Sequence, residues 1–213
     1  MYAFIREARK QKQGASSLFE KFAGAKGWGF SKEDTGTIQT IAKSFQGIGQ
    51  FYSPSRGKLL PHNVISGSIP EGSIHFFQHT VRVYDGYALQ LNVFFLQLNT
   101  PINQSLVIRF KKGKKKISNL FYTDPEIPLD ETLSGDIVVH GKDSDAILQF
   151  INTIDLSNII RSANKLKWRV DLQIKNDRIA LYLSERNADI ETHEDLIALL
   201  EFLQAAVTSL KHK

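Results

Sequence analysis

Two histidines, His75 and His79, are four residues apart, which is the spacing at which an α-helix holds one zinc ion between two imidazoles. Their neighbours, which include Phe76, Phe77 and Val81, favour a strand instead. Two residues four apart on a strand lie about 13 Å from each other, too far to share one ion. The sequence therefore predicts ordinary strand histidines and no metal site at this position.

A third histidine, His140, stands at the end of a predicted strand and close to Asp143 and Asp145. A metal ligand set or an acid–base pair would use this combination of an imidazole and carboxylates. A loop that enters a helix explains the two aspartates more simply, because aspartate is a favoured N-cap residue. We favour this structural interpretation and keep the chemical one as its alternative.

The other motifs that commonly carry chemistry are incomplete. Ser66-Gly67-Ser68 has no glycine two residues before either serine, so it does not form a nucleophile elbow. The glycines at 24, 27 and 29 lack the lysine of a phosphate loop, and Gly47-Ile48-Gly49 is followed by Tyr52 where the dinucleotide fingerprint requires glycine. The absence of cysteine excludes disulfides, thiolate zinc sites and cysteine nucleophiles. We therefore predict a non-enzymatic protein with no catalytic residue, metal or cofactor.

The most conspicuous local feature is a basic run around Gly113. It contains Arg109, Lys111, Lys112, Lys114, Lys115 and Lys116, and we refer to residues 111–116 as the lysine segment. Its ammonium groups lack nearby carboxylates, so the run is predicted to project into solvent on a turn. Such a tip binds phosphates of anionic lipid or nucleic acid, or it is only a solvated turn. Few aromatic residues interrupt it, so no base-stacking platform is indicated.

Charge is distributed unevenly along the chain. Residues 1–116 hold 17 Lys/Arg against 6 Asp/Glu, a balance of +11, and residues 117–213 hold 10 against 16, a balance of −6; together they give the net charge of +5. A basic first half favours an anionic lipid surface, a nucleic acid or an acidic partner. The alternative is that the two halves attract each other or stay solvated.

The stretch Trp168–Leu183 carries the clearest structural pattern. Apolar and polar residues alternate on both sides of Asn176-Asp177, a pair that tolerates the positive φ of a tight turn. The pattern predicts a hairpin with strands over 168–175 and 178–184. The side chains predicted to point inward are Trp168, Val170, Leu172, Ile174, Ile179, Leu181 and Leu183. Helices predicted over about 144–162 and 193–210 supply the cover that this apolar side needs.

The first half of the chain is predicted to contain helices followed by strands. The helical segments are the basic Tyr2–Gln13, an amphipathic helix over 15–26 that ends at Gly27, and a short helix over Thr37–Phe45. Strands are predicted over 64–69, 73–84, 87–98, 105–110 and 136–140. Because the turns between the first four strands are too short for crossover helices, we expect an antiparallel meander.

The best candidate for a domain boundary is residues 124–134, which contain two prolines and the carboxylates Asp124, Glu126, Asp130 and Glu131. Their spacing is not that of a calcium loop, so a solvated acidic linker is favoured over a cation site. The predicted organisation is a basic segment at 1–14, a helix and β meander at 15–123, the linker, and a β-αα-ββ-α second half at 135–213. The two larger parts form either separate units or one continuous domain.

Several short motifs in the chain are the basis for a resemblance to other proteins. They are Leu18-Phe19-Glu20-Lys21-Phe22-Ala23 with Gly27-Trp28, Asn63-Val64-Ile65-Ser66-Gly67, Gly135-Asp136-Ile137-Val138-Val139 and the hairpin turn. Over about residues 15–210 the chain resembles a broad set of uncharacterised prokaryotic proteins, many of them soluble domains on the cytoplasmic side of a membrane anchor. The resemblance implies a location near a membrane, but no activity and no site residue.

This chain departs from that set because no stretch approaches the roughly 18 uninterrupted apolar residues of a membrane span. Residues 1–5 would be the remnant of an anchor, and the basic residues 6–12 suit a juxtamembrane segment.

Together these patterns predict an α+β fold, with a mostly antiparallel sheet and helices at the N-terminus, in the centre and at the C-terminus. The predicted function is a non-enzymatic domain that binds a protein partner or an anionic surface, such as anionic lipid, at the cytoplasmic face of a membrane. The alternative is a nucleic-acid-associated protein that uses the basic first half. The third interpretation is a hydrolase whose site the sequence does not reveal.

Overall fold

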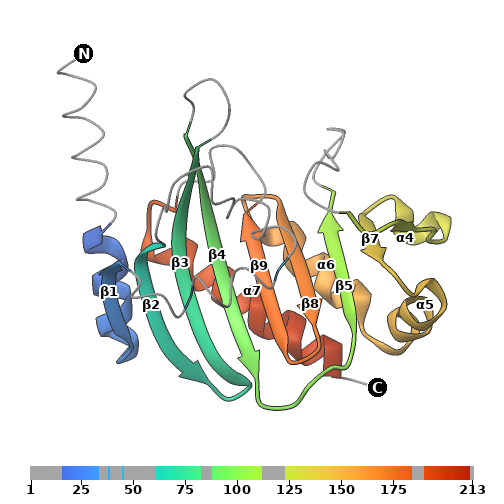
Figure 1. Ribbon diagram of the computed structural model, residues 1–213, viewed down its shortest axis with the longest axis horizontal. Helices are drawn as coiled ribbons and strands as arrows, with labels where there is room; N and C mark the ends of the chain where they lie inside the picture. The colour runs from blue at the N-terminus through green and yellow to red at the C-terminus, as the bar shows by residue number, and fades with distance from the viewer. Residues whose placement is uncertain are drawn as a thin grey trace.

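The computed structural model describes residues 16–33, 38, 45, 61–82, 88–111, 123–183 and 190–211, and over 79–82 and 88–90 it describes the backbone alone. Within these ranges the chain forms one antiparallel nine-stranded sheet with helices on one face and at both ends (Figure 1). The predicted α+β class is therefore confirmed, including the N-terminal, central and C-terminal helices. The basic segment at 1–14 lies outside the described residues, as does most of the helix predicted over 37–45.

The strands are β1 (Gly29–Glu33), β2 (His62–Ile69), β3 (Gly72–Arg82), β4 (Ala88–Leu98), β5 (Ser105–Phe110), β6 (Glu126–Ile127), β7 (Ile137–Gly141), β8 (Val170–Lys175) and β9 (Arg178–Leu183). Their order across the sheet is β1-β2-β3-β4-β9-β8-β5-β7-β6. The sheet thus contains strands from both sides of residues 124–134, and those residues themselves hold β6 and a short helix. The predicted meander is correct as far as β4 and wrong for β5, because the hairpin β8–β9 lies between them.

The predicted hairpin is confirmed in its turn, register and inward side. Asn176 adopts a φ of 56°, and Lys175 and Arg178 are directly paired across the two-residue turn. All seven side chains predicted to point inward are buried, although β8 begins at Val170 rather than at Trp168. A tight turn between alternating strands is a local feature, which is why the sequence alone reveals it.

The connection between β4 and β5 runs past the hairpin turn and binds it. Leu98 donates its backbone N–H to Asp177 O (2.7 Å). Ile102 N donates to Asn176 O (2.9 Å), and Asn176 N donates to Gln104 O (2.7 Å). These hydrogen bonds satisfy the polar backbone of both the turn and the connection, and they hold β4 and β5 two strands apart.

The helices are residues 16–26, α4 (Glu131–Ser134), α5 (Ser144–Thr153), α6 (Leu156–Lys165) and α7 (His193–Lys211). Asp143 caps α5 by accepting from Ala146 N (3.1 Å), and Asp155 caps α6 by accepting from Asn158 N (3.0 Å). At the start of α7, Asp195 N donates to Thr192 Oγ1 and Thr192 N donates to Asp195 Oδ2, which together form a capping box.

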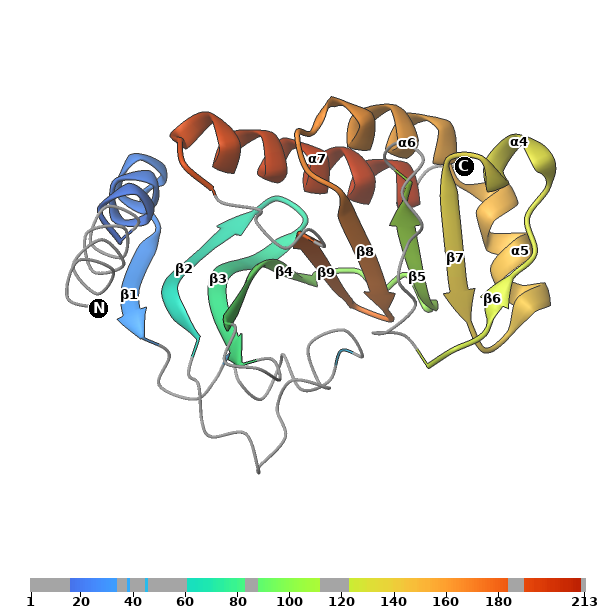
Figure 2. The same cartoon turned by 90° about the horizontal axis from the view of Figure 1, so that it is seen from above.

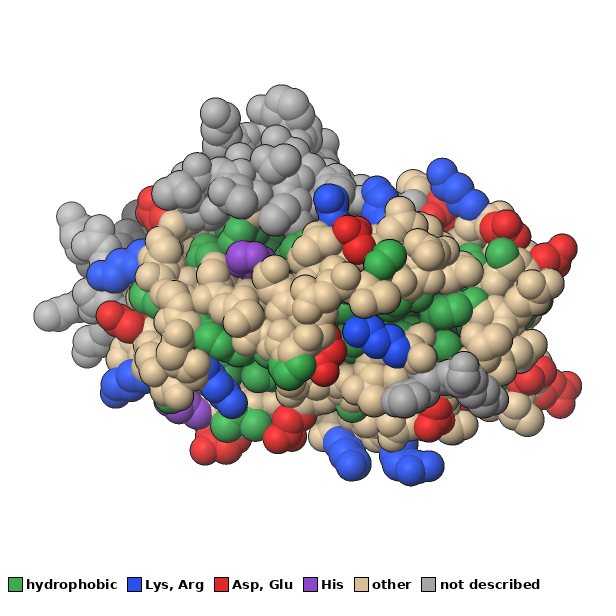
Figure 3. Space-filling model, turned by 90° about the horizontal axis from the view of Figure 1, so that it is seen from below, with side chains coloured by type: hydrophobic (Ala, Val, Ile, Leu, Met, Phe, Trp, Pro, Cys, Tyr) green, Lys and Arg blue, Asp and Glu red, His purple; other side chains and the backbone are tan. Residues whose placement is uncertain are grey.

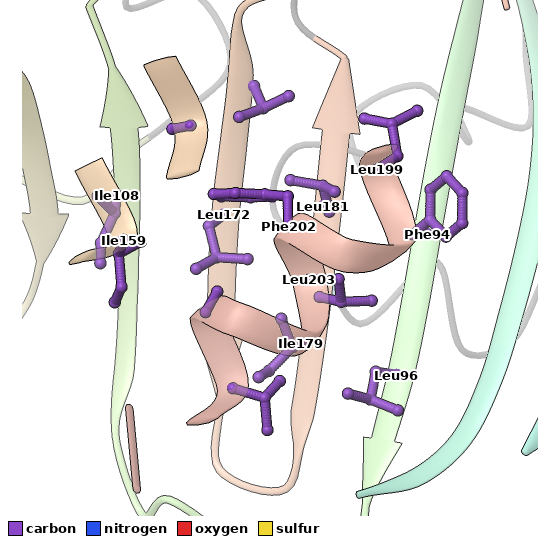
Figure 4. Close-up of a cluster of buried hydrophobic side chains, with 14 of the residues drawn as sticks. Phe94, Leu96, Ile108, Ile159, Leu172, Ile179, Leu181, Leu199, Phe202 and Leu203 are labelled. Carbon is purple, nitrogen blue, oxygen red and sulfur yellow. The ribbon is translucent and has the colours of Figure 1, made fainter. Parts of the chain in front are cut away.

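The helices α6 and α7 cover one face of the sheet, which we term the helix face (Figure 2). In Figure 4, Phe202 of α7 lies between Leu172 of β8 and Leu181 of β9, and all three side chains are buried. Burial of this kind stabilises a fold by about 1.5–3 kcal/mol for each large apolar side chain. The core of the fold is therefore built on the hairpin.

The opposite face of the sheet, which we term the outer face, is also buried. Val64, Phe77, Val93, Phe95, Ala180 and Tyr182 form a second apolar cluster there with Ile38 and Phe45. The alternation in the hairpin predicts burial of its apolar side only, yet Asp171 and Gln173 are 2% and 5% exposed. A two-sided core explains the difference, because central strands covered on both faces bury polar positions as well.

The N-terminal helix ends at Gly27, as predicted, and sets the position of Trp28. Gly27 has a φ of 68°, Gly27 N donates to Gly24 O (3.1 Å) and Trp28 N donates to Ala23 O (2.8 Å), a Schellman motif. The Trp28 ring then lies against Gly67 of β2, where an added Cβ would stand 2.3–2.5 Å from three ring atoms. Gly67 therefore has no room for a side chain.

We expect Gly67→Ala to destabilise the fold by about 1–3 kcal/mol, because the Trp28 ring must move to make room for the methyl group. Gly24→Ala is the matched control, since an added Cβ there meets nothing within 4 Å. The control is expected to stabilise the helix by about 0.5–1 kcal/mol. Urea unfolding measures both changes, and equal stabilities for the two variants would contradict the packing described for Trp28.

Candidate functional site

Arg109, predicted as part of the solvent-exposed basic tip, lies inside the sheet. It is 3% exposed, and its Nε stands 3.4 Å from Asp171 Oδ2 on β8. The two residues are direct partners in the register of β5 and β8. The prediction is wrong for Arg109, because β5 is a central strand and its odd-numbered side chains point into the covered outer face. A buried, ion-paired guanidinium does not reach an external anion.

Lys111 is half-buried and fixes the start of the lysine segment. Its backbone N–H donates to Asp136 O (2.7 Å), and its Nζ donates to Ser134 O at the end of α4. A lysine on the last carbonyl of a helix is a favourable contact with the negative end of the helix dipole. Lys112, Lys114, Lys115 and Lys116 lie outside the described residues, so their predicted exposure stays a prediction.

The pair Arg109–Asp171 belongs to a buried polar cluster on the outer face. Tyr182 on β9, Asp171 on β8 and Arg109 on β5 occupy one row across three neighbouring strands. Tyr182 donates its hydroxyl to Gln173 Oε1 at 2.8 Å. Burial raises the pKa of Tyr182 well above its ordinary value, and the negative charge of Asp171 raises it further. Tyr182 therefore stays protonated at neutral pH and acts as a hydrogen-bond donor.

His75 lies on strand β3, as predicted, and contacts a serine. Its Nδ1 is 2.9 Å from Ser66 Oγ on the neighbouring strand, and its ring lies 6.1 Å from that of Phe95. The Ser66–His75 distance is that of a nucleophile and its base. Ladder amides lie in the plane of a sheet, however, so they do not point at an oxyanion above Ser66. The side chain of His79 lies outside the described residues.

His140 lies on β7 and is 3% exposed. Its Nδ1 stands 3.2 Å from the backbone oxygen of Asp124, and Asp143 is occupied as the cap of α5. In the part of the chain that the structure describes, no three His, Asp or Glu side chains are grouped so that they would hold a metal ion. The hydrogen bond from Ala146 N to Asp143 at the start of α5 confirms the favoured helix-entry interpretation of Asp143.

A second buried polar group lies on the helix face, and sequence reasoning missed it. Asn63 Nδ2 donates to Gln78 Oε1 (2.7 Å), and Gln78 Nε2 donates to Asn92 Oδ1 (2.8 Å). Asn63 has a φ of 51° at an irregularity where the register of β2 and β3 shifts. These three side-chain amides connect three strands. In the sequence, they are visible only as polar residues within otherwise apolar strands.

Acidic residues that are spread along the sequence gather at one end of the molecule. They are Asp124, Glu126, Asp130, Glu131, Asp136, Asp143, Asp145 and Asp155, and residues 124–155 contain a single Lys or Arg, Lys142. They lie on or next to β6, β7, α4 and α5, at the right of Figure 1. Figure 3 shows acidic side chains at this end and a mixture of both signs across the middle of the view.

Comparison with known proteins finds no match: no family model, no curated protein and no solved structure is similar to this chain. Within the described ranges, none of the helices has the length and hydropathy needed to span a membrane.

The buried ion pair between Arg109 and Asp171 can be tested by mutation. Asp171→Leu alone is expected to lower the free energy of unfolding by about 3–5 kcal/mol, because it leaves the Arg109 charge buried without its carboxylate. The double variant Arg109→Met/Asp171→Leu is expected to recover most of that loss, because it removes both charges. Urea unfolding of the two single variants and the double variant measures the coupling, and simply additive losses would contradict a direct ion pair.

Proposed function

We propose that this chain is a non-enzymatic binding domain whose lysine segment attaches it to an anionic surface at a membrane. The observation that carries the proposal is that Lys111, the first residue of the lysine segment, is held in place by hydrogen bonds. Phe110 ends β5 in the core, and Lys111 is tied through its N–H and its Nζ to the turn between α4 and β7. The sheet therefore fixes the position of Lys111, the first residue of the lysine segment.

The buried polar groups contact one another, and this supports a binding role over a catalytic one. Arg109 pairs with Asp171, Tyr182 with Gln173, and Asn63, Gln78 and Asn92 with one another. Groups that satisfy each other within a core serve packing and register, whereas catalytic groups must face a substrate.

Replacing Lys112, Lys114, Lys115 and Lys116 with Gln tests the proposal. At an anionic surface each lysine contributes about 1 kcal/mol, so the four together account for a roughly thousandfold change in affinity. We expect flotation with phosphatidylserine-containing vesicles to be lost and the unfolding curve to stay unchanged. The unmodified protein should also release the vesicles as salt rises.

The matched control carries Gln at Lys26, Lys142, Lys165 and Lys211, four exposed lysines on other elements, and has the same net charge. It is expected to retain most of the binding. Equal losses in both variants, or binding that survives the replacements and high salt, would refute the proposal. A nucleic-acid shift assay run on the same proteins reports the alternative partner, and a shift without flotation would replace lipid by nucleic acid.

A second candidate function is that of a serine hydrolase. One contact favours it, because Ser66 Oγ lies 2.9 Å from His75 Nδ1. If this candidate is correct, a fluorophosphonate probe should label the protein, and Ser66→Ala should abolish the labelling. Ser68→Ala is the control, because Ser68 is an exposed serine on the same strand that pairs with Ser73. On the binding-domain proposal we expect no labelling of the unmodified protein above the level of Ser66→Ala.

A further inference from the structure

Four side chains stand in one row across the outer face of the sheet, at the end where the hairpin turns. Arg178 of β9 is paired directly with Lys175 of β8, and Gln97 of β4 and Ser105 of β5 flank them. Because side chains alternate along a strand and Ile179 points to the helix face, this row points to the outer face. Lys175 and Ser105 are exposed, and the side chain of Arg178 is 39% exposed. The row is therefore open to solvent at the lower end of Figure 1.

The two central residues of the row, Lys175 and Arg178, carry the same charge. Residues directly opposite each other in an antiparallel pair have Cβ atoms about 5 Å apart, and like charges at this separation destabilise the pair. An anion that lies between the two side chains removes the repulsion, because it attracts both cations. The like-charged pair therefore points to a negatively charged ligand.

The guanidinium of Arg178 is held in one orientation. Arg178 Nε donates to Gln97 Oε1 (3.2 Å) and lies 3.7 Å from Asp177 Oδ1. Gln97 is fixed in turn, because its Nε2 donates to Asp177 Oδ2 (2.6 Å). Within the described part of the chain, both side-chain contacts of Arg178 use Nε, so the edge formed by its two Nη groups is left for a ligand.

Backbone hydrogen bonds hold the turn that carries the row. Leu98 N donates to Asp177 O (2.7 Å), and Asn176 N donates to Gln104 O (2.7 Å), so β4 and the connection to β5 fix both residues of the turn. A side chain on a rigid turn loses less conformational freedom on binding than one on a mobile loop. The guanidinium is therefore oriented before a ligand arrives.

We propose that Arg178 and Lys175 form a binding site for one phosphate group. The two Nη groups of a guanidinium fit two oxygens of a phosphate, and an ammonium on the neighbouring strand contacts a third. The hydroxyl of Ser105, next in the row, is a further donor. A carboxylate has two oxygens, which the arginine alone would occupy, so the adjacent lysine favours phosphate over carboxylate.

The phosphate site is separate from the lysine segment of the proposed function. Ser105 begins β5 and Lys111 follows its end, and this length of strand spans about 20 Å. One small anion therefore does not contact both. Binding of phosphate at the hairpin stands or fails independently of whether the lysine segment attaches the protein to a membrane.

Titration with inorganic phosphate at fixed ionic strength, followed by backbone amide chemical shifts, tests the site. We expect saturable shifts confined to the hairpin turn and the adjoining ends of β4 and β5. Arg178→Gln and Lys175→Gln should each weaken the binding about tenfold, because each removes charge-assisted hydrogen bonds. The matched controls are Arg161→Gln and Lys165→Gln, which remove the same charges from exposed positions on α6 and should change the affinity less than about twofold.

Two further variants separate ligand binding from a structural role of the row. Asp177→Asn keeps a turn-forming residue and an acceptor for Gln97 but removes the carboxylate beside the guanidinium, so phosphate should bind about threefold more tightly. Glu201→Gln on α7 is its control and should leave the affinity unchanged. Arg178→Lys keeps the charge but lacks the paired Nη groups, and it should lose most of the binding.

Shifts that do not saturate, or equal affinities in Arg178→Gln and Arg161→Gln, would overturn the proposal. The source of the phosphate is determined with vesicles of phosphatidic acid in phosphatidylcholine, on a background with Gln at Lys112, Lys114, Lys115 and Lys116. Flotation that is lost in Arg178→Gln supports the site and identifies a lipid headgroup as its ligand. Saturable binding of free phosphate without flotation supports the site and identifies a soluble phosphate compound.

Discussion

The insertion of the hairpin β8–β9 between β4 and β5 is the pairing on which the rest of the structure depends. Tyr182 of β9 pairs with Val93 of β4, and Asp171 of β8 pairs with Arg109 of β5. Without the hairpin, β4 and β5 would be two edges with unpaired amides. With it, one continuous sheet supports α6 and α7 on one face and a second apolar cluster on the other.

What the sequence predicts well in this fold is local. The alternation around Asn176-Asp177 predicts the hairpin, and Asp143 marks the start of α5, because each feature depends on residues close together in the chain. The order of strands is not local. The spacing of β4 and β5 predicts neighbours, and only the hydrogen bonds from 98–104 to the hairpin turn explain why they are separated.

At the candidate site, too, the sequence predicts local features but not contacts between distant parts of the chain. A basic run is visible in the sequence, but Arg109 was assigned to it because nothing near it identifies Asp171 as its partner. The Ser66–His75 contact was missed for a related reason, since it depends on the register of two strands and not on a motif. Lys111 is visible in the sequence as part of the run, but its contact with α4 depends on where β5 and β7 meet.

The position of the hairpin has a consequence for synthesis of the chain on the ribosome. The two strands that complete the centre of the sheet emerge after β1 to β7, since they follow these seven described strands in the sequence. Until residue 183 is available, β1 to β4 and β5 to β7 are partial sheets that end in open, apolar edges. Such edges pair readily with other chains, so the nascent protein is exposed to aggregation until the hairpin has been synthesised. A chaperone that holds these edges until the hairpin arrives would therefore improve its yield.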